Sequence, residues 1–157
     1  MKAADTVWVA AALLQRERGP DADMSVAEIV DRAAELNGVA RSTLQTMASQ
    51  HLVATARPSP DRYRMLTAVG RGRRRLYREG DPYDVARTAG PTHPDASSLD
   101  DEFRDLVGWY EDAFREATPA VNRLDAMEDL IRYARESGVW RGVAADQYVA
   151  ELRAGWE

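Results

Sequence analysis

The chain has 157 residues, of which 45% are hydrophobic and 30% are charged, and its formal net charge is −5. This composition is typical of a soluble globular protein with one domain, or with a small domain of roughly 85–90 residues and a helical extension. Because the chain has no cysteine, disulfides, thiolate metal sites and cysteine nucleophiles are excluded.

The charge is distributed unevenly along the chain. Residues 41–80 contain nine Arg and two acidic residues, a net charge of +7. Residues 1–40 sum to −3 (four basic, seven acidic) and residues 81–157 to −9 (eight basic, seventeen acidic). Because attraction to phosphate depends on local rather than total positive charge, this segregation predicts a surface for a polyanion.

The longest apolar run, residues 7–14, is much shorter than the roughly 20 residues that span a bilayer. The start of the chain also lacks the basic lead and the small-residue cleavage pattern of a signal peptide. We therefore expect a cytoplasmic protein with no membrane segment.

The first predicted helix begins near Asp5 or Thr6 and ends before Gly19. It is apolar on most sides, which predicts a buried helix in a three-helix core. The second helix begins with a capping box formed by Ser25 and Glu28, and Asn37-Gly38 predicts a left-handed end.

A third helix follows after a short turn. Ser42 and Gln45 have the spacing of a second capping box, and the apolar residues that follow recur at helical spacing up to Leu52. Two capped helices joined by a short turn are the sequence outline of a helix-turn-helix.

A β-hairpin is predicted after these helices. Residues 52–55 read as a short strand, and residues 63–69 and 73–78 read as strands on either side of Gly70-Arg71-Gly72. Leu76 is the only obvious core residue of the last strand, so we expect most of the Arg side chains of the hairpin to project into solvent.

The order of these elements, with the RSTLQ helix and the hairpin sequence VGRGRRRLYREGDPYD, resembles a winged helix-turn-helix. More narrowly, it is similar to small bacterial proteins of restriction and defence type whose wings carry a GRGxxRLY-like pattern. The resemblance covers roughly residues 5–85. It implies a mainly α fold of three helices and a β-hairpin wing, a nucleic-acid-binding domain over residues 1–85, and a recognition helix over residues 41–52.

Residues 86–98 are predicted to be a Pro-rich linker, and residues 99–157 an acidic, all-helical region. Its first helix is capped by Ser97 or Ser98, the second begins at Thr118-Pro119, and the third covers about residues 143–153. We expect these helices to form a homodimer or to dock a protein partner.

The candidate DNA-binding residues fall into two groups. On the recognition helix, exposed side chains are expected to enter the major groove, where Arg can pair with guanine and Gln with adenine. These are Arg41, Ser42, Thr43, Gln45, Thr46 and Gln50. On the wing, five Arg are expected to contact phosphates, with Arg62 and Arg64 in support. The five are Arg71, Arg73, Arg74, Arg75 and Arg78.

Two other interpretations of these residues are open. The helix face could be an ordinary solvated surface, and the wing Arg could pair with the acidic C-terminal helices of this chain or of a partner. Both roles of the wing are compatible if the acidic helices screen it from DNA.

The sequence does not favour an enzyme. It contains no Gly-rich phosphate loop, no GxSxG and no HExxH, and its two isolated histidines do not predict a metal site or a cofactor. We therefore expect a protein that binds double-stranded DNA, either as a transcriptional regulator or as the targeting element of a defence system. The alternative is an antitoxin-like or adaptor module that binds protein without a direct role on DNA.

Overall fold

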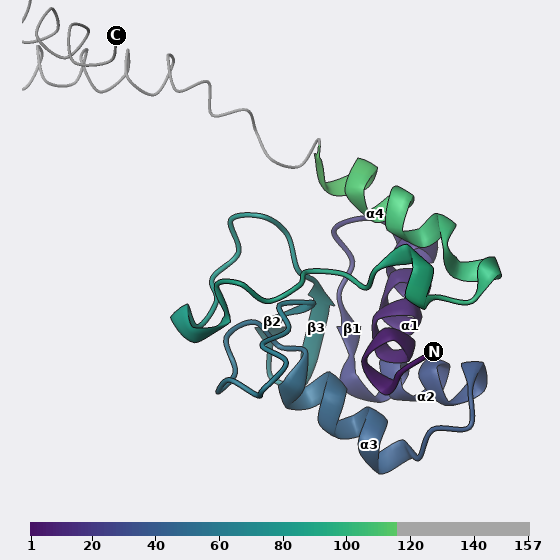
Figure 1. The fold of residues 1–157 in the computed structure, drawn as a ribbon, viewed down its shortest axis with the longest axis horizontal. Coiled ribbons are helices and arrows are strands. Elements are labelled where there is room, and N and C mark those ends of the chain that lie inside the picture. Colours follow the sequence, from purple (N-terminus) through teal and green to yellow (C-terminus); the bar gives the residue numbers. More distant parts are fainter. Residues whose placement is uncertain (116–157) are drawn as a thin grey trace, which may run out of the picture. The chain divides into compact units, whose positions relative to one another are not determined.

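The structure, a computed structural model, describes residues 1–115 (Figure 1). In chain order its main elements are α1 (Ala3–Arg18), β1 (Met24–Ser25), α2 (Val26–Leu36), α3 (Arg41–Thr46), the π-helical turn η1 (Met47–His51), β2 (Leu66–Gly70), β3 (Arg73–Leu76) and α4 (Asp105–Arg115). Three short 3-10 turns are η2 (Val85–Arg87), η3 (Ala96–Ser98) and η4 (Asp101–Phe103). The expected mixture of helices and a β-hairpin is confirmed. No helix within residues 1–115 is long and apolar enough to cross a membrane.

Helix α1 is the centre of the hydrophobic core. Trp8 and its neighbours are fully buried on most sides of the helix, as its sequence predicts. The helix begins at Ala3, two or three residues earlier than expected, and ends before Gly19, whose φ of 107° is a backbone angle that favours glycine. The fully buried Gln15 binds α1 to the sheet, because its side-chain oxygen accepts from the backbone N–H of Leu76 at 2.8 Å.

Helix α2 begins as predicted and ends differently. The Ser25 hydroxyl accepts from the Glu28 backbone N–H at 3.1 Å, and the Glu28 carboxylate accepts from the Ser25 N–H at 2.8 Å. At the other end, the predicted left-handed stop is wrong, because Asn37 is extended (φ −156°). Its side chain donates to the Thr6 hydroxyl at 2.6 Å and accepts from the Val39 N–H at 3.0 Å, and these bonds fix the turn instead.

The Glu28 carboxylate of this capping box makes the free energy of unfolding depend on pH in the acid range. Hydrogen bonds from Arg18 and then from Ser25 lower the pKa of Glu28 from 4.5 to about 2. Because the folded-state pKa is depressed, the stabilisation is present above pH 4.5 and is lost as the pH falls toward 2. Glu28→Gln is therefore expected to flatten the acid side of the stability profile, measured by urea unfolding between pH 5 and about 2. Glu102→Gln, at an exposed position, is the matched control, and equal profiles for the two variants would contradict the prediction.

The three strands form an antiparallel sheet in the order β1-β3-β2. Strands β2 and β3 make the predicted hairpin, with a bulge between Ala68 and Gly70 and a tight turn at Arg71-Gly72, where Gly72 has a φ of 68°. The strand β1 was not predicted. It pairs Met24 and Ser25 with Arg74 and Arg73, and the Val26 N–H donates to the Gly72 carbonyl at 2.9 Å. The hairpin is thus joined edge to edge with the chain that enters α2.

The segment after the hairpin differs from the expected linker. Arg87 in η2 is fully buried, and Leu99 belongs to the same hydrophobic core as α1. Figure 1 shows α4 lying beside α1, and the buried α4 residues Leu106, Val107, Tyr110 and Phe114 join that core. The predicted helix from Ser97 or Ser98 is replaced by two 3-10 turns, with α4 beginning only at Asp105. The expected helices beyond residue 118 lie outside the described residues.

Candidate nucleic-acid interface

The helical segment α3–η1 has one buried and one exposed face. Leu44 and Ala48 are fully buried, which fixes the orientation of the segment on the core. The six residues predicted to face DNA, Arg41, Ser42, Thr43, Gln45, Thr46 and Gln50, are all exposed. The segment 36–60 contains no acidic residue. The segment therefore offers hydroxyl and amide groups and carries no carboxylate of its own, and the carboxylate that contacts this face is that of Asp31 of α2, which pairs with Arg41.

The second predicted capping box is not formed. Ala40 is the N-cap of α3 and makes no side-chain cap, so Ser42 lies inside the helix. Its backbone carbonyl accepts from the Thr46 hydroxyl at 3.0 Å, and the Gln45 amide donates to the Ser49 hydroxyl at 3.2 Å. These local bonds order part of the exposed face in the absence of a ligand.

Arg74 connects the hairpin to the end of this helical segment. Its guanidinium donates to the carbonyls of Ala48 and Ser49, each at 3.3 Å, and burial lowers its pKa. Carbonyls at a helix C-terminus lack partners within the helix, so a cation that donates to them is favourable there. Arg74 therefore positions α3–η1 against β3.

Three other Arg of the hairpin are paired with carboxylates of this chain. Arg73 binds Asp23, Arg75 binds Asp81, and Arg78 binds Asp21 at 2.9 Å. The prediction that most hairpin Arg project into solvent is wrong for these residues and for Arg74, since all four are half-buried. Intramolecular pairing was the alternative interpretation, but the partners found here precede β1 or follow β3 and do not lie on the C-terminal helices.

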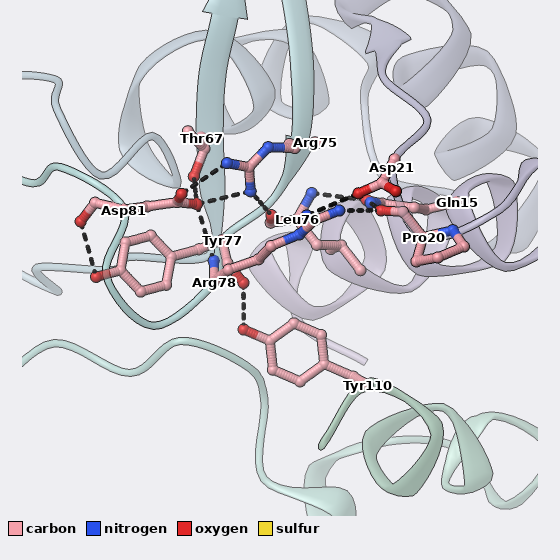
Figure 2. A network of polar contacts seen from close by, with 10 residues as sticks. All are labelled: Gln15, Pro20, Asp21, Thr67, Arg75, Leu76, Tyr77, Arg78, Asp81 and Tyr110. Atoms are coloured by element: carbon pink, nitrogen blue, oxygen red, sulfur yellow. Dashed lines mark hydrogen bonds and ion pairs between the residues drawn. The ribbon is translucent and has the colours of Figure 1, made fainter. Parts of the chain in front are cut away.

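The most buried of these ion pairs is centred on Asp81 (Figure 2). Its carboxylate accepts from both terminal nitrogens of Arg75 at 2.6 and 2.7 Å, from the Thr67 hydroxyl at 2.7 Å and from the Arg78 backbone N–H at 2.9 Å. Burial opposes ionisation of Asp81, but the hydrogen bonds from Arg75 and Thr67 outweigh it and lower its pKa. Asp81 thus joins β2, β3 and the chain that follows β3.

The Arg residues without a carboxylate partner lie mainly outside the hairpin strands. Within residues 1–115, Arg57, Arg62 and Arg71 are exposed and make no side-chain contact with a carboxylate. Arg64 donates to the Gly90 carbonyl at 3.2 Å and lies 4.6 Å from the centre of the Tyr83 ring, so its charge is also not neutralised. Arg41 is paired with Asp31, but both side chains are about 60% exposed (62% and 59%), where an ion pair contributes little, about 0–1 kcal/mol.

The sequence analysis did not find Arg57 as a candidate and gave Arg74 a different role. Arg57 lies in a segment that breaks regular structure, and only the absence of acidic residues between positions 36 and 60 could have indicated it. The positioning role of Arg74 could not be predicted, because it depends on how β3 packs against η1. Among the described residues, no group of three or more His, Asp or Glu side chains could hold a metal ion.

The comparisons with known proteins add no family. No protein-family model matches this chain, and no curated protein or solved structure matches it.

Proposed function

We propose that this chain binds double-stranded DNA as a winged helix-turn-helix protein, in which α3–η1 enters the major groove and the β2–β3 hairpin is the wing. The observation that carries the proposal is the exposed face of α3–η1. This face carries six exposed polar side chains. The segment lies within residues 36–60, a stretch of 25 residues without Asp or Glu. Gln and Arg at such a face can hydrogen-bond base edges, and Ser and Thr can bond either bases or phosphates.

The hairpin has a narrower role in this proposal than its sequence suggests. Arg71 at the turn is the hairpin Arg that is free to contact a phosphate. Arg73, Arg75 and Arg78 are held by carboxylates, and Arg74 by helix carbonyls. We therefore assign these four Arg to the scaffold that positions α3–η1 and the turn.

The biological setting that we propose is a transcriptional regulator or the targeting element of a defence system. Such a protein gains affinity and reads longer sites as a homodimer, because two recognition helices then contact successive faces of the duplex. Helix α4 packs its apolar residues Leu106, Val107, Tyr110 and Phe114 into the core that it shares with α1. We propose the dimer contact on the C-terminal helices expected from the sequence, most of which lie outside the described residues.

The proposal is tested by placing negative charge on the exposed face. Thr43→Glu together with Thr46→Glu is expected to weaken binding to a labelled random-sequence duplex by roughly tenfold or more, because carboxylates beside phosphates repel them. Ser97→Glu together with Ser98→Glu makes the same charge change at exposed residues of η3 and should leave binding close to wild type. Equal losses for the two double variants would count against the helix as the DNA-reading element.

One observation favours a second candidate, a protein-binding module of antitoxin or adaptor type. Three hairpin Arg form ion pairs with carboxylates of the same chain. The hairpin therefore presents less unpaired positive charge than a phosphate-binding surface usually does. Under this alternative the full-length chain would not bind duplex DNA at low salt, and it would co-purify in a fixed ratio with a basic protein partner.

A further inference from the structure

The loop between η1 and β2 contains three Arg residues that lie outside the β2–β3 hairpin. Arg57 and Arg62 are exposed, and Arg64 follows at the end of the loop. The only acidic side chain of the loop is Asp61. Unlike Arg73 and Arg75 of β3, none of the three is paired with a carboxylate within residues 1–115.

The loop is held in shape by a buried cation. The guanidinium of Arg87 is fully buried and donates to four backbone carbonyls, those of His51, Ala56, Arg57 and Tyr63, at 2.5–3.0 Å. Because one guanidinium bonds both Arg57 and Tyr63, the two ends of the loop lie side by side. Because it also bonds His51, the loop is fixed to the end of η1.

A second contact fixes the position of Arg62. A Cβ atom at Gly90 would lie 1.6 Å from the Arg62 carbonyl oxygen, so only glycine allows the two backbones to approach so closely. The Arg64 N–H donates to the Pro91 carbonyl at 2.9 Å, and its side chain lies against the ring of Tyr83. The chain after η2 thus packs against the loop at Arg62 and Arg64.

Arg62 has a backbone conformation that an arginine rarely adopts. Its φ is 53°, and it is the only non-glycine residue with a positive φ among residues 1–115. The left-handed region is unfavourable for a residue with a Cβ, and glycine or asparagine would be the expected choice for stability. Local strain of this kind is often found at functional sites. An exposed, strained Arg with no partner is therefore better explained by a ligand than by the fold.

We propose that Arg57, Arg62 and Arg64 form a second DNA contact, the loop clamp, which binds the phosphate backbone of the same duplex beyond the end of α3–η1. The inference depends on the proposed function, because the clamp is attached to the end of the helix assigned to the major groove. Arginine suits this role, since its planar fork matches the oxygens of a phosphate group. The rigid support by Arg87 and Gly90 would reduce the entropy lost when the Arg side chains engage the backbone.

The test compares salt dependence for full-length variants on a labelled random-sequence duplex. Arg57→Gln with Arg62→Gln is expected to weaken binding at low salt and to reduce the slope of log K against log salt by about 1.8, since each lost phosphate contact removes about 0.9. Arg16→Gln with Arg104→Gln removes the same charge from α1 and from the segment before α4, and should leave the slope unchanged. Equal slopes for the two double variants, with the wild type still binding, would overturn the loop clamp while the proposed function survived. No binding by the wild type would overturn both.

A single variant separates a ligand role from a structural one. Arg62→Gly removes the side chain and relieves the left-handed strain. We expect it to reduce the salt slope by about 0.9 without lowering Tm. A lower Tm with an unchanged slope would show that the Arg62 side chain serves the fold, and would overturn the inference.

Discussion

Replacing Arg87 with Met is expected to lower the free energy of unfolding by about 3 kcal/mol or more, the largest effect of any single change considered for this chain. The substitution takes away the donor of four backbone carbonyls and puts an apolar side chain at the fully buried position of Arg87. Each unsatisfied buried carbonyl costs about 1–3 kcal/mol. These carbonyls belong to the main chain, so the cost cannot be removed by repacking side chains.

Arg87→Lys is expected to rescue little of this loss. An ammonium group offers its donors from one point, whereas the four carbonyls are arranged around a planar fork. Urea unfolding of the full-length chain measures both variants. Arg104→Met makes the same chemical change at an exposed residue of the segment before α4 and should cost less than about 0.5 kcal/mol. An Arg87→Met variant as stable as this control would contradict the role of Arg87 as the support of the loop.

Asp81→Asn is expected to cost about 2–3 kcal/mol, because it removes the charge that Arg75 needs and replaces one of the two carboxylate oxygens that accept hydrogen bonds in Figure 2. The side chains of Asp81 and Arg75 are only 13% and 18% exposed, so water cannot replace the lost bonds. Asp21→Asn is a matched control, since Asp21 pairs with Arg78 but is 89% exposed. It should cost less than about 0.5 kcal/mol.

The cost of Asp81→Asn should depend on pH in a defined direction. The pKa of Asp81 is lowered in the folded state, so its stabilisation is present above the unfolded value of 3.8 and is lost as the pH falls through the lower folded value. The difference in unfolding free energy between wild type and Asp81→Asn should therefore be constant above pH 5 and should shrink below about pH 3.8. A difference that grows on acidification would show that Asp81 is not the ionised centre of these contacts.

The parts of the fold that were predicted correctly have local signals. The capping box of Ser25 and Glu28 and the tight turn near Gly72 depend on residues a few positions apart, and the sequence is enough to place them. The capping box proposed for Ser42 shows the limit of such signals, since α3 begins two residues earlier, with Ala40 as its N-cap and without a side-chain cap.

The parts that were missed depend on residues far apart in the chain. Arg73 pairs with Asp23, fifty positions away, and no periodicity reveals such a partner. The region around Arg87 and Gly90 resembles a linker in composition, because a buried hydrogen-bonding side chain and a close backbone approach leave no hydrophobic pattern. Of the candidate site, the exposed helix face was predicted residue by residue. The distribution of free and paired Arg required the structure.

The most direct test of the proposed function is binding of the full-length wild-type chain to a labelled random-sequence duplex, followed by fluorescence anisotropy from low to physiological salt. The exposed face of α3–η1, Arg71 and the loop clamp together predict measurable binding at low salt. The logarithm of the binding constant should fall linearly with the logarithm of salt concentration, by about 0.9 for each phosphate contacted. Absence of binding at the lowest salt concentration would contradict a DNA-binding function and would direct the search to a protein partner.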